Sequence, residues 1–195
     1  MRLLLHICCA PCAIGALAPL RAEGHDITGL FYNPNIHPFL EFRKRIKALK
    51  VLCESDPLRV IFDESYGLET FVQVIYRPSR PERCAACYDE RLRRTALVAR
   101  EKGLDAFTTT LLVSPHQDHE SVRVTGERVA QETGTSFLYR DFRSHHERAH
   151  EEARRRSIYL QQYCGCCFSE YERYRDTTRE LYRGANPRRG REEGG

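Results

Sequence analysis

The sequence has no long apolar run. Its first apolar stretch covers only residues 3–7, which is far shorter than the h-region of a secretory signal or the roughly 20 residues that cross a bilayer. We therefore expect a cytoplasmic protein with no membrane anchor, in a compartment that keeps thiols reduced. The chain of 195 residues is long enough for one domain with a hydrophobic core and too short for two domains of ordinary size.

Lysine is scarce. Of the 31 basic residues only Lys44, Lys47, Lys50 and Lys102 are lysines, and the rest are arginines. The planar guanidinium suits phosphate binding and base stacking better than an ammonium does. With a net charge of only +4, composition alone leaves two interpretations open, which are nucleic-acid binding and a genomic preference for arginine codons.

A glycine-rich phosphate loop is also missing. The place after the first expected strand, where such a loop would stand, is occupied by "CCAPC" at residues 8–12. A phosphate cradle needs glycines and exposed backbone amides. Nucleotide hydrolysis of the usual doubly wound kind is therefore not expected, and this position is expected to hold metal instead.

What the sequence does have is an alternation of strand and helix patterns. Strands are expected at residues 2–7, 26–32, 58–62, 105–112 and 135–142, and helices at 13–24, 39–53, 68–76, 84–103 and 121–134. Two arginine-rich helical segments are expected to flank "YCGCCFSEY" at residues 163–171. This pattern predicts an α/β fold, with a mostly parallel, doubly wound (Rossmann-like) sheet, helices on both faces and a helical C-terminal segment.

The expected domain covers residues 1–183, and residues 184–195 are expected to be a disordered tail. In doubly wound folds the site lies at the carboxyl ends of the strands. The loops at residues 8–12, 33–38 and 114–118 each follow a strand. We therefore expect all three loops at one edge of the sheet.

Nine cysteines in a reduced chain of this size call for metal, cluster or redox chemistry rather than a disulfide scaffold. Seven of them fall into three groups, which are Cys8, Cys9 and Cys12, then Cys84 and Cys87, then Cys164 and Cys166. Cys84 and Cys87 form a C-x-x-C at the expected start of a helix, where the helix dipole favours thiolate. The long gaps between groups favour clustered cofactor chemistry over structural zinc, which needs only four ligands.

Other candidates have simpler interpretations. Cys53 lies on the apolar face of its helix and is expected in the core, and Cys167 is expected to point away from its neighbour Cys166. His6 is expected to be a hydrogen-bonded core histidine or a partner of the nearby thiolates. The remaining polar candidates are His37, His116 and His119 as loop proton donors, Asp118 and Glu41 as carboxylates that assist a metal or are merely solvated, and His145, His146 and His150 on a solvated helix face.

Five motifs then point to one family. "HICCAPC", "NPNIHP" with Glu41 downstream, "CAACYDERL", "FTTTLLVSPHQ" and "QQYCGC" occur in this order between His6 and Ser169. Together they resemble the cobalamin-independent epoxyqueuosine reductases. The resemblance implies a parallel α/β iron–sulfur enzyme that reduces epoxyqueuosine in tRNA to queuosine, with a further iron proposed beside its cluster.

The resemblance also implies site residues. Cys8, Cys9, Cys84 and Cys87 match the ligands of a 4Fe–4S cluster. Cys164 and Cys166, with Cys12 nearby, match a pair interpreted either as a redox-active dithiol or as ligands of a second, mononuclear iron. The chain departs from the family pattern in having His116 where a tyrosine is more usual after "SP", and in the additional Cys167.

The chemistry requires two electrons, a Lewis acid and a proton donor. Tyr163, His116, Asp118 or a water is expected to supply the proton. The expected partners are tRNA, held partly by Arg154–Arg156 and Arg188–Arg189, and an external electron donor. The alternatives are another iron–sulfur tRNA-modifying enzyme, such as a radical or thiol-transfer enzyme, and a zinc-stabilised RNA-binding module.

Overall fold

Strand β1 (Arg2–His6) is the middle strand of a five-stranded parallel sheet, in the computed structural model that describes residues 1–77 and 79–176. The strand order is β3 (Arg59–Phe62), β2 (Asp26–Phe31), β1, β4 (Ala106–Thr109) and β5 (Ser136–Phe137). Leu4 pairs with Thr28 of β2 on one side and with Phe107 of β4 on the other. The expected doubly wound α/β class is confirmed.

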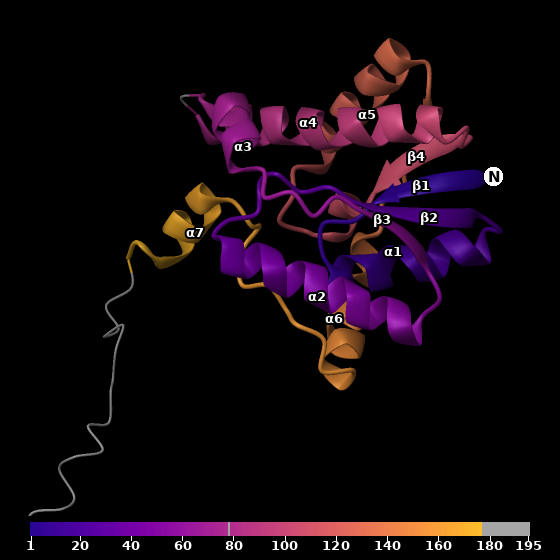
Figure 1. Ribbon diagram of the computed structural model, residues 1–195, viewed down its shortest axis with the longest axis horizontal. Helices are drawn as coiled ribbons and strands as arrows, with labels where there is room; N and C mark the ends of the chain where they lie inside the picture. Colours follow the sequence, from indigo (N-terminus) through magenta and orange to yellow (C-terminus); the bar gives the residue numbers. More distant parts are fainter. Residues whose placement is uncertain (78, 177–195) are drawn as a thin grey trace, which may run out of the picture.

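Helices cover both faces of this sheet (Figure 1). Helices α1 (Ala10–Ala22), α2 (Phe39–Ser55) and α6 (His146–Arg155) lie on one face, and α3 (Leu68–Ile75), α4 (Arg80–Glu101) and α5 (His119–Thr133) lie on the other. Because both faces are covered, the middle strand is a continuous apolar run, and Leu3, Leu4 and Leu5 are fully buried. The short helix α7 (Cys167–Tyr174) lies beyond the carboxyl ends of the strands.

Two helices begin earlier than their sequence patterns indicate. Helix α1 begins at Ala10, directly after its N-cap Cys9, so that Cys12 stands in its first turn. Helix α4 begins at Arg80 rather than at Cys84, because Ser79 and Glu82 form a reciprocal capping box. Residues 80–83, expected to belong to a loop, therefore supply the first turn of α4.

The last strand is shorter than expected. Strand β5 has only two residues, which pair with Ala106 and Phe107 of β4. Strand β4 is also shorter than expected, because the 3-10 helix η1 (Thr110–Val113) replaces its last residues. The arginine-rich segment before "YCGCC" forms α6, whereas α7 begins inside that motif at Cys167. The expected tail and Arg188–Arg189 lie outside the described residues. No helix within the described part of the chain is long and apolar enough to span a membrane.

Gly126 lies inside α5, as expected, and permits close packing of α5 on the edge strand. A Cβ at this position would overlap the ring of Phe137 in β5. Gly126→Ala should therefore lower the free energy of unfolding by about 1–3 kcal/mol, despite the better helix propensity of alanine. Urea unfolding of the two proteins checks this. In a Phe137→Leu background the same substitution should cost less, and an equal cost in both backgrounds would contradict the packing explanation.

Candidate functional site

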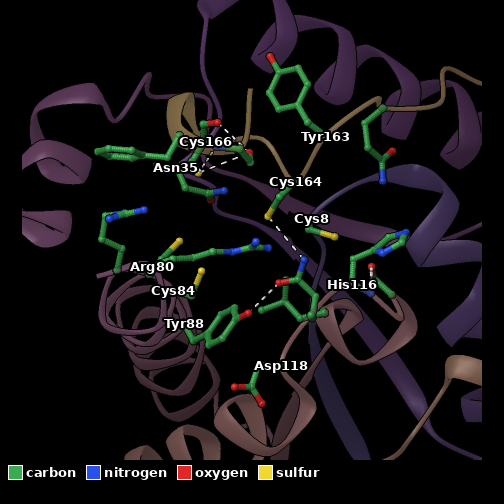
Figure 2. A pocket seen from close by; sticks show the side chains of 18 of the residues that line it. Cys8, Asn35, Arg80, Cys84, Tyr88, His116, Asp118, Tyr163, Cys164 and Cys166 are labelled. Atoms are coloured by element: carbon green, nitrogen blue, oxygen red, sulfur yellow. Dashed lines mark hydrogen bonds between the residues drawn. The ribbon is translucent and has the colours of Figure 1, made fainter. Parts of the chain in front are cut away.

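A cavity of about 830 Å³ opens at the carboxyl edge of the sheet, and all three cysteine groups reach it (Figure 2). Its lining includes six thiols, from Cys8, Cys12, Cys84, Cys87, Cys164 and Cys166. The loops after β1, β2 and β4 all contribute, with Cys8, Asn35 and Gln117 among the lining residues. The expectation that these three loops share one edge is confirmed.

The cavity lies where the strand order reverses. The chain leaves β1 toward β2 and α1, whereas β4 belongs to the other half of the sheet, so that the loops after β1 and β4 diverge. A threonine directly after β4 holds the first cysteine at this point. The Cys8 amide donates to Thr110 Oγ1 at 3.0 Å, and the Thr110 hydroxyl donates to Cys8 Sγ at 3.3 Å.

Cys8, Cys9 and Cys12 form a compact triad whose sulfurs all lie within 4.8 Å of one another. Cys9 and Cys12 are buried. Hydrogen bonding with Cys12 and with Cys9 lowers the pKa of the Cys8 thiol, whereas hydrogen bonding with Cys8 and with Cys9, followed by burial, raises the pKa of Cys12. Three convergent thiols without competing carboxylates are soft ligands, and this triad can hold a metal ion.

Helix α4 turns a second set of side chains toward the cavity. Counted from Cys84, the next members of this set follow at three, four and seven residues, and they are Cys87, Tyr88 and Arg91. This spacing places all four side chains on one face of the helix. Burial raises the pKa of the Cys84 thiol and raises that of Cys87 to about 12. The expectation that a helix N-terminus favours these thiolates is wrong, because α4 begins at Arg80 and the dipole acts mainly within the first turn.

A buried ion pair between Arg45 and Glu41 holds the backbone of the third cysteine group, Cys164 and Cys166. The Arg45 guanidinium donates to the backbone carbonyls of Tyr163 and Cys164, each at 2.9 Å, and its Nε donates to Glu41 Oε1 at 2.8 Å. Arg45 is 2 % exposed and Glu41 is 5 % exposed. Glu41 is therefore the buried partner of Arg45 and not a solvated first-turn carboxylate, which corrects the sequence-based expectation.

Gly165 allows the "YCGC" segment to pack closely against Arg45. Its φ of 131° is a conformation that residues with side chains rarely adopt, and a Cβ there would lie 3.2 Å from the Arg45 guanidinium. The Gly165 carbonyl accepts from the His37 amide at 2.7 Å. The Tyr163 hydroxyl donates to the His37 carbonyl at 2.7 Å. The loop after β2 and the "YCGC" segment are thus fastened together.

Amide side chains connect the sulfurs to the rest of the cavity wall. Gln117 Nε2 donates to Cys164 Sγ at 3.5 Å and its Oε1 accepts from the Tyr88 hydroxyl at 3.0 Å (Figure 2). Gln161 Nε2 donates to Cys9 Sγ at 3.1 Å. Neither glutamine was expected to be a site residue, although each stands inside a motif, "SPHQ" or "QQYCGC".

Of the expected proton donors, Tyr163, His116 and Asp118 line the cavity, whereas His37 and His119 are buried and do not line it. The carboxylate of Asp118 caps α5 by accepting from the Ser121 amide at 3.1 Å. Tyr163 turns its hydroxyl away from the sulfurs, toward His37 (Figure 2). Within the described residues, the ring nitrogens of the exposed His116 have no hydrogen-bond partner.

His146 and His150 extend the wall beside His116. The rings of His116 and His146 lie 6.4 Å apart, and those of His146 and His150 lie 4.3 Å apart. Partial burial lowers the pKa of both α6 histidines. Both line the cavity, so the expectation of a solvated helix face is wrong for them.

Three further expectations concern residues at the margin of the site. His6 is a fully buried core histidine whose ring nitrogens contact Thr109 Oγ1 at 2.9 Å and the Tyr32 carbonyl at 3.1 Å, and burial lowers its pKa to about 4. Cys53 packs at the edge of the core. Cys167 is exposed and begins α7, while Cys166 caps that helix with its sulfur.

Arginines and an aromatic ring form one rim of the cavity. Arg80, Arg83 and Arg173 line it together with Phe168. The Arg83 guanidinium lies 4.3 Å from the centre of the Phe168 ring. Cations beside exposed rings are the groups that commonly hold single-stranded nucleic acid.

Known proteins with this sequence pattern share one description. A family model described as epoxyqueuosine reductase QueH matches residues 3–172. An epoxyqueuosine reductase QueH from Dehalococcoides mccartyi is 36% identical over 173 residues, covering 89% of this chain and 94% of the relative. The protein of the same description from Thermotoga maritima is 34% identical over 182 residues, covering 87% and 91% of the two chains. Another, from Histophilus somni, is 34% identical over 200 residues, covering 96% and 77%.

The Arg45 support yields a stability prediction. Arg45→Met leaves Glu41 buried without its cation and two carbonyls without donors, which should lower the free energy of unfolding by about 3–5 kcal/mol. Urea unfolding measures this. Arg43→Met, an exposed position on the same helix, is the control and should change stability by less than about 0.5 kcal/mol. Arg45→Met with Glu41→Leu should recover part of the loss, and a double variant no more stable than the single one would contradict the ion-pair explanation.

Proposed function

The chain belongs to the family of epoxyqueuosine reductases QueH, which are oxidoreductases acting on tRNA, and we propose that it reduces epoxyqueuosine in a tRNA anticodon loop to queuosine. One observation carries the proposal. Three cysteine groups that are far apart in the sequence line a single cavity at the strand-order reversal. Such a cavity suits a reaction in which electrons are delivered to a nucleobase that is held inside the protein.

The residues present fit an iron–sulfur cluster. Cys8 and Cys9 from the end of β1, with Cys84 and Cys87 from α4, are the four thiols proposed to hold it. Thiolates are the usual ligands of such clusters, and this donor set holds no competing carboxylate. When bound, a cluster supplies electrons one at a time, at a potential that the surrounding protein sets.

Cys164 and Cys166, with Cys12 nearby, are proposed as the second pair, which either holds a mononuclear iron or acts as a redox dithiol. Gln117 donates to the sulfur of Cys164, and the Ser169 amide donates to that of Cys166 at 3.3 Å. Both sulfurs thus accept a hydrogen bond at the cavity wall, and thiols are soft ligands that can bind iron or form a disulfide.

Conversion of the epoxide to an alkene takes two electrons and two protons and releases the oxygen as water. Of the three proposed proton donors, His116 has the freest side chain. Tyr163 donates its proton to the His37 carbonyl, and Asp118 is occupied at the N-terminus of α5. His116 is also exposed at the cavity wall, so it can take a proton from water and pass it to the departing oxygen.

The rim fits an RNA loop better than a duplex. Arg173 is an exposed cation that lines the cavity together with Phe168, and the exposed Arg80 lines it too, at 3.5 Å from the Glu172 carboxylate. Bases of an RNA loop can splay out and stack on such side chains. Arg154 follows His150 by one turn of α6 and is exposed, so it remains a proposed contact. Arg155 and Arg156 each form an ion pair with Glu152, which leaves them less available for phosphate.

The cofactor prediction rests on cysteines from two elements. Protein purified without oxygen should be brown and contain iron and acid-labile sulfide, and Cys84→Ala should lose most of both, because a cluster missing one thiolate is open to solvent. Metal and sulfide analysis with visible spectra checks this. Cys53→Ala, outside the cavity, is the control and should keep both. Stoichiometric zinc without sulfide would overturn the cofactor and favour a zinc-stabilised RNA-binding module.

The reaction itself has a direct assay. With a low-potential reductant, an anticodon stem-loop that contains epoxyqueuosine should lose one oxygen, as seen by mass spectrometry of the digested product. An unmodified stem-loop should bind through its backbone without reacting, and its binding should weaken as salt rises. Cluster-loaded enzyme that leaves the epoxide intact under several reductants would overturn the proposed activity.

A further inference from the structure

Arg91 is a buried cation at the centre of the site whose charge the proposed reaction does not yet use. It lies on α4 and is 2 % exposed. Its Nε donates to the Cys87 carbonyl at 3.0 Å, and its guanidinium lies 5.7 Å from the centre of the Tyr88 ring. These contacts satisfy one N–H group and pack the side chain, but neither of them neutralises the charge.

Arg91 forms no ion pair with a carboxylate in the described part of the chain. This distinguishes it from Arg45, the other buried arginine that lines the cavity, which pairs with Glu41. Removing a guanidinium from water costs several kcal/mol unless an anion compensates for it. The fold therefore maintains a buried positive charge at a place where no protein carboxylate balances it.

The groups that can balance this charge are the thiols. Arg91 lines the same cavity as Cys8, Cys87 and Cys164, which are members of all three cysteine groups. A phosphate of the tRNA backbone is a poor alternative partner, because the side chain is almost inaccessible to solvent.

We infer that Arg91 is the counter-charge of the metal centre, and that it raises the reduction potential of the cluster bound by the thiols around it. The inference rests on the proposed iron–sulfur cofactor. A thiolate-bound cluster is anionic and gains one further negative charge when it accepts an electron from the external low-potential donor. A fixed cation nearby stabilises the reduced form more than the oxidised form, since the interaction grows with the charge.

This role makes Arg91 a positioning and tuning residue, because it acts through the cluster and its ligands. Its sequence position is consistent with that role. Arg91 follows Cys87 by four residues and Cys84 by seven, so the pattern C-x-x-C-x-x-x-R presents two ligands and one cation on the same helix face. The helix thus carries both the thiols and the charge that compensates for them.

The test measures the midpoint potential of the cluster in anaerobically prepared protein, by dithionite titration followed in visible and electron paramagnetic resonance spectra. Arg91→Gln should lower the equilibrium constant for one-electron reduction at least about tenfold, which corresponds to a midpoint potential about 59 mV more negative. Arg94→Gln removes an exposed arginine from the same helix and is the matched control. It should leave the potential close to that of the wild type, because water screens its charge.

Arg91→Lys keeps the charge and should hold a full complement of iron and sulfide at a potential near the wild-type value. If Arg91→Gln takes up no cluster, the lysine variant decides, because its recovery of the cluster supports a charge role and equal loss overturns it. Equal potentials in Arg91→Gln and Arg94→Gln, each with a full cluster, would overturn this inference alone. A wild-type protein that takes up no cluster would overturn the proposed cofactor and this inference with it.

Discussion

The structure depends on the position of β1, which is paired on both edges and covered on both faces. A strand so enclosed must be apolar, and the chain that leaves its carboxyl end emerges at the reversal of strand order. Because only residues 7–9 separate β1 from α1, three thiols are confined to the space where the loops after β1 and β4 diverge. The other two cysteine groups reach this place from α4 and from the segment before α7. The cysteine-lined cavity is thus located by topology, and its thiols come from three separate parts of the fold.

The two buried arginines that line the cavity, Arg45 and Arg91, have different roles. Arg45 is compensated by Glu41 and uses its remaining donors to hold the backbone of the third cysteine group. Arg91 is buried without a carboxylate partner among the described residues and faces the thiols. The first arrangement gives the site its shape, and the second leaves positive charge available to an anionic cofactor. The neutral donors Gln117 and Gln161 complete the surroundings of the sulfurs.

Much of this could be predicted from the sequence, because the periodicity of the apolar residues and the alternation of elements determine the sheet, and the motifs stand at the strand ends. What could not be predicted were features set by tertiary contacts. The capping box of Ser79 and Glu82 moved the start of α4 and removed the expected dipole effect on Cys84. Glu41 was expected either to assist a metal or to be solvated, but it is the buried i,i+4 partner of Arg45, which contacts the "YCGC" segment. Burial of an arginine beside cysteines cannot be inferred from composition.

The central claim is that thiols from β1 and α4 hold one cluster. Iron-edge anomalous diffraction from crystals of the anaerobically prepared protein tests it most directly. The account predicts iron in the cavity, bound by sulfurs of Cys8 and Cys9 from one side and of Cys84 and Cys87 from the other. Metal bound only by the triad of Cys8, Cys9 and Cys12, with the two α4 thiols free, would contradict the account.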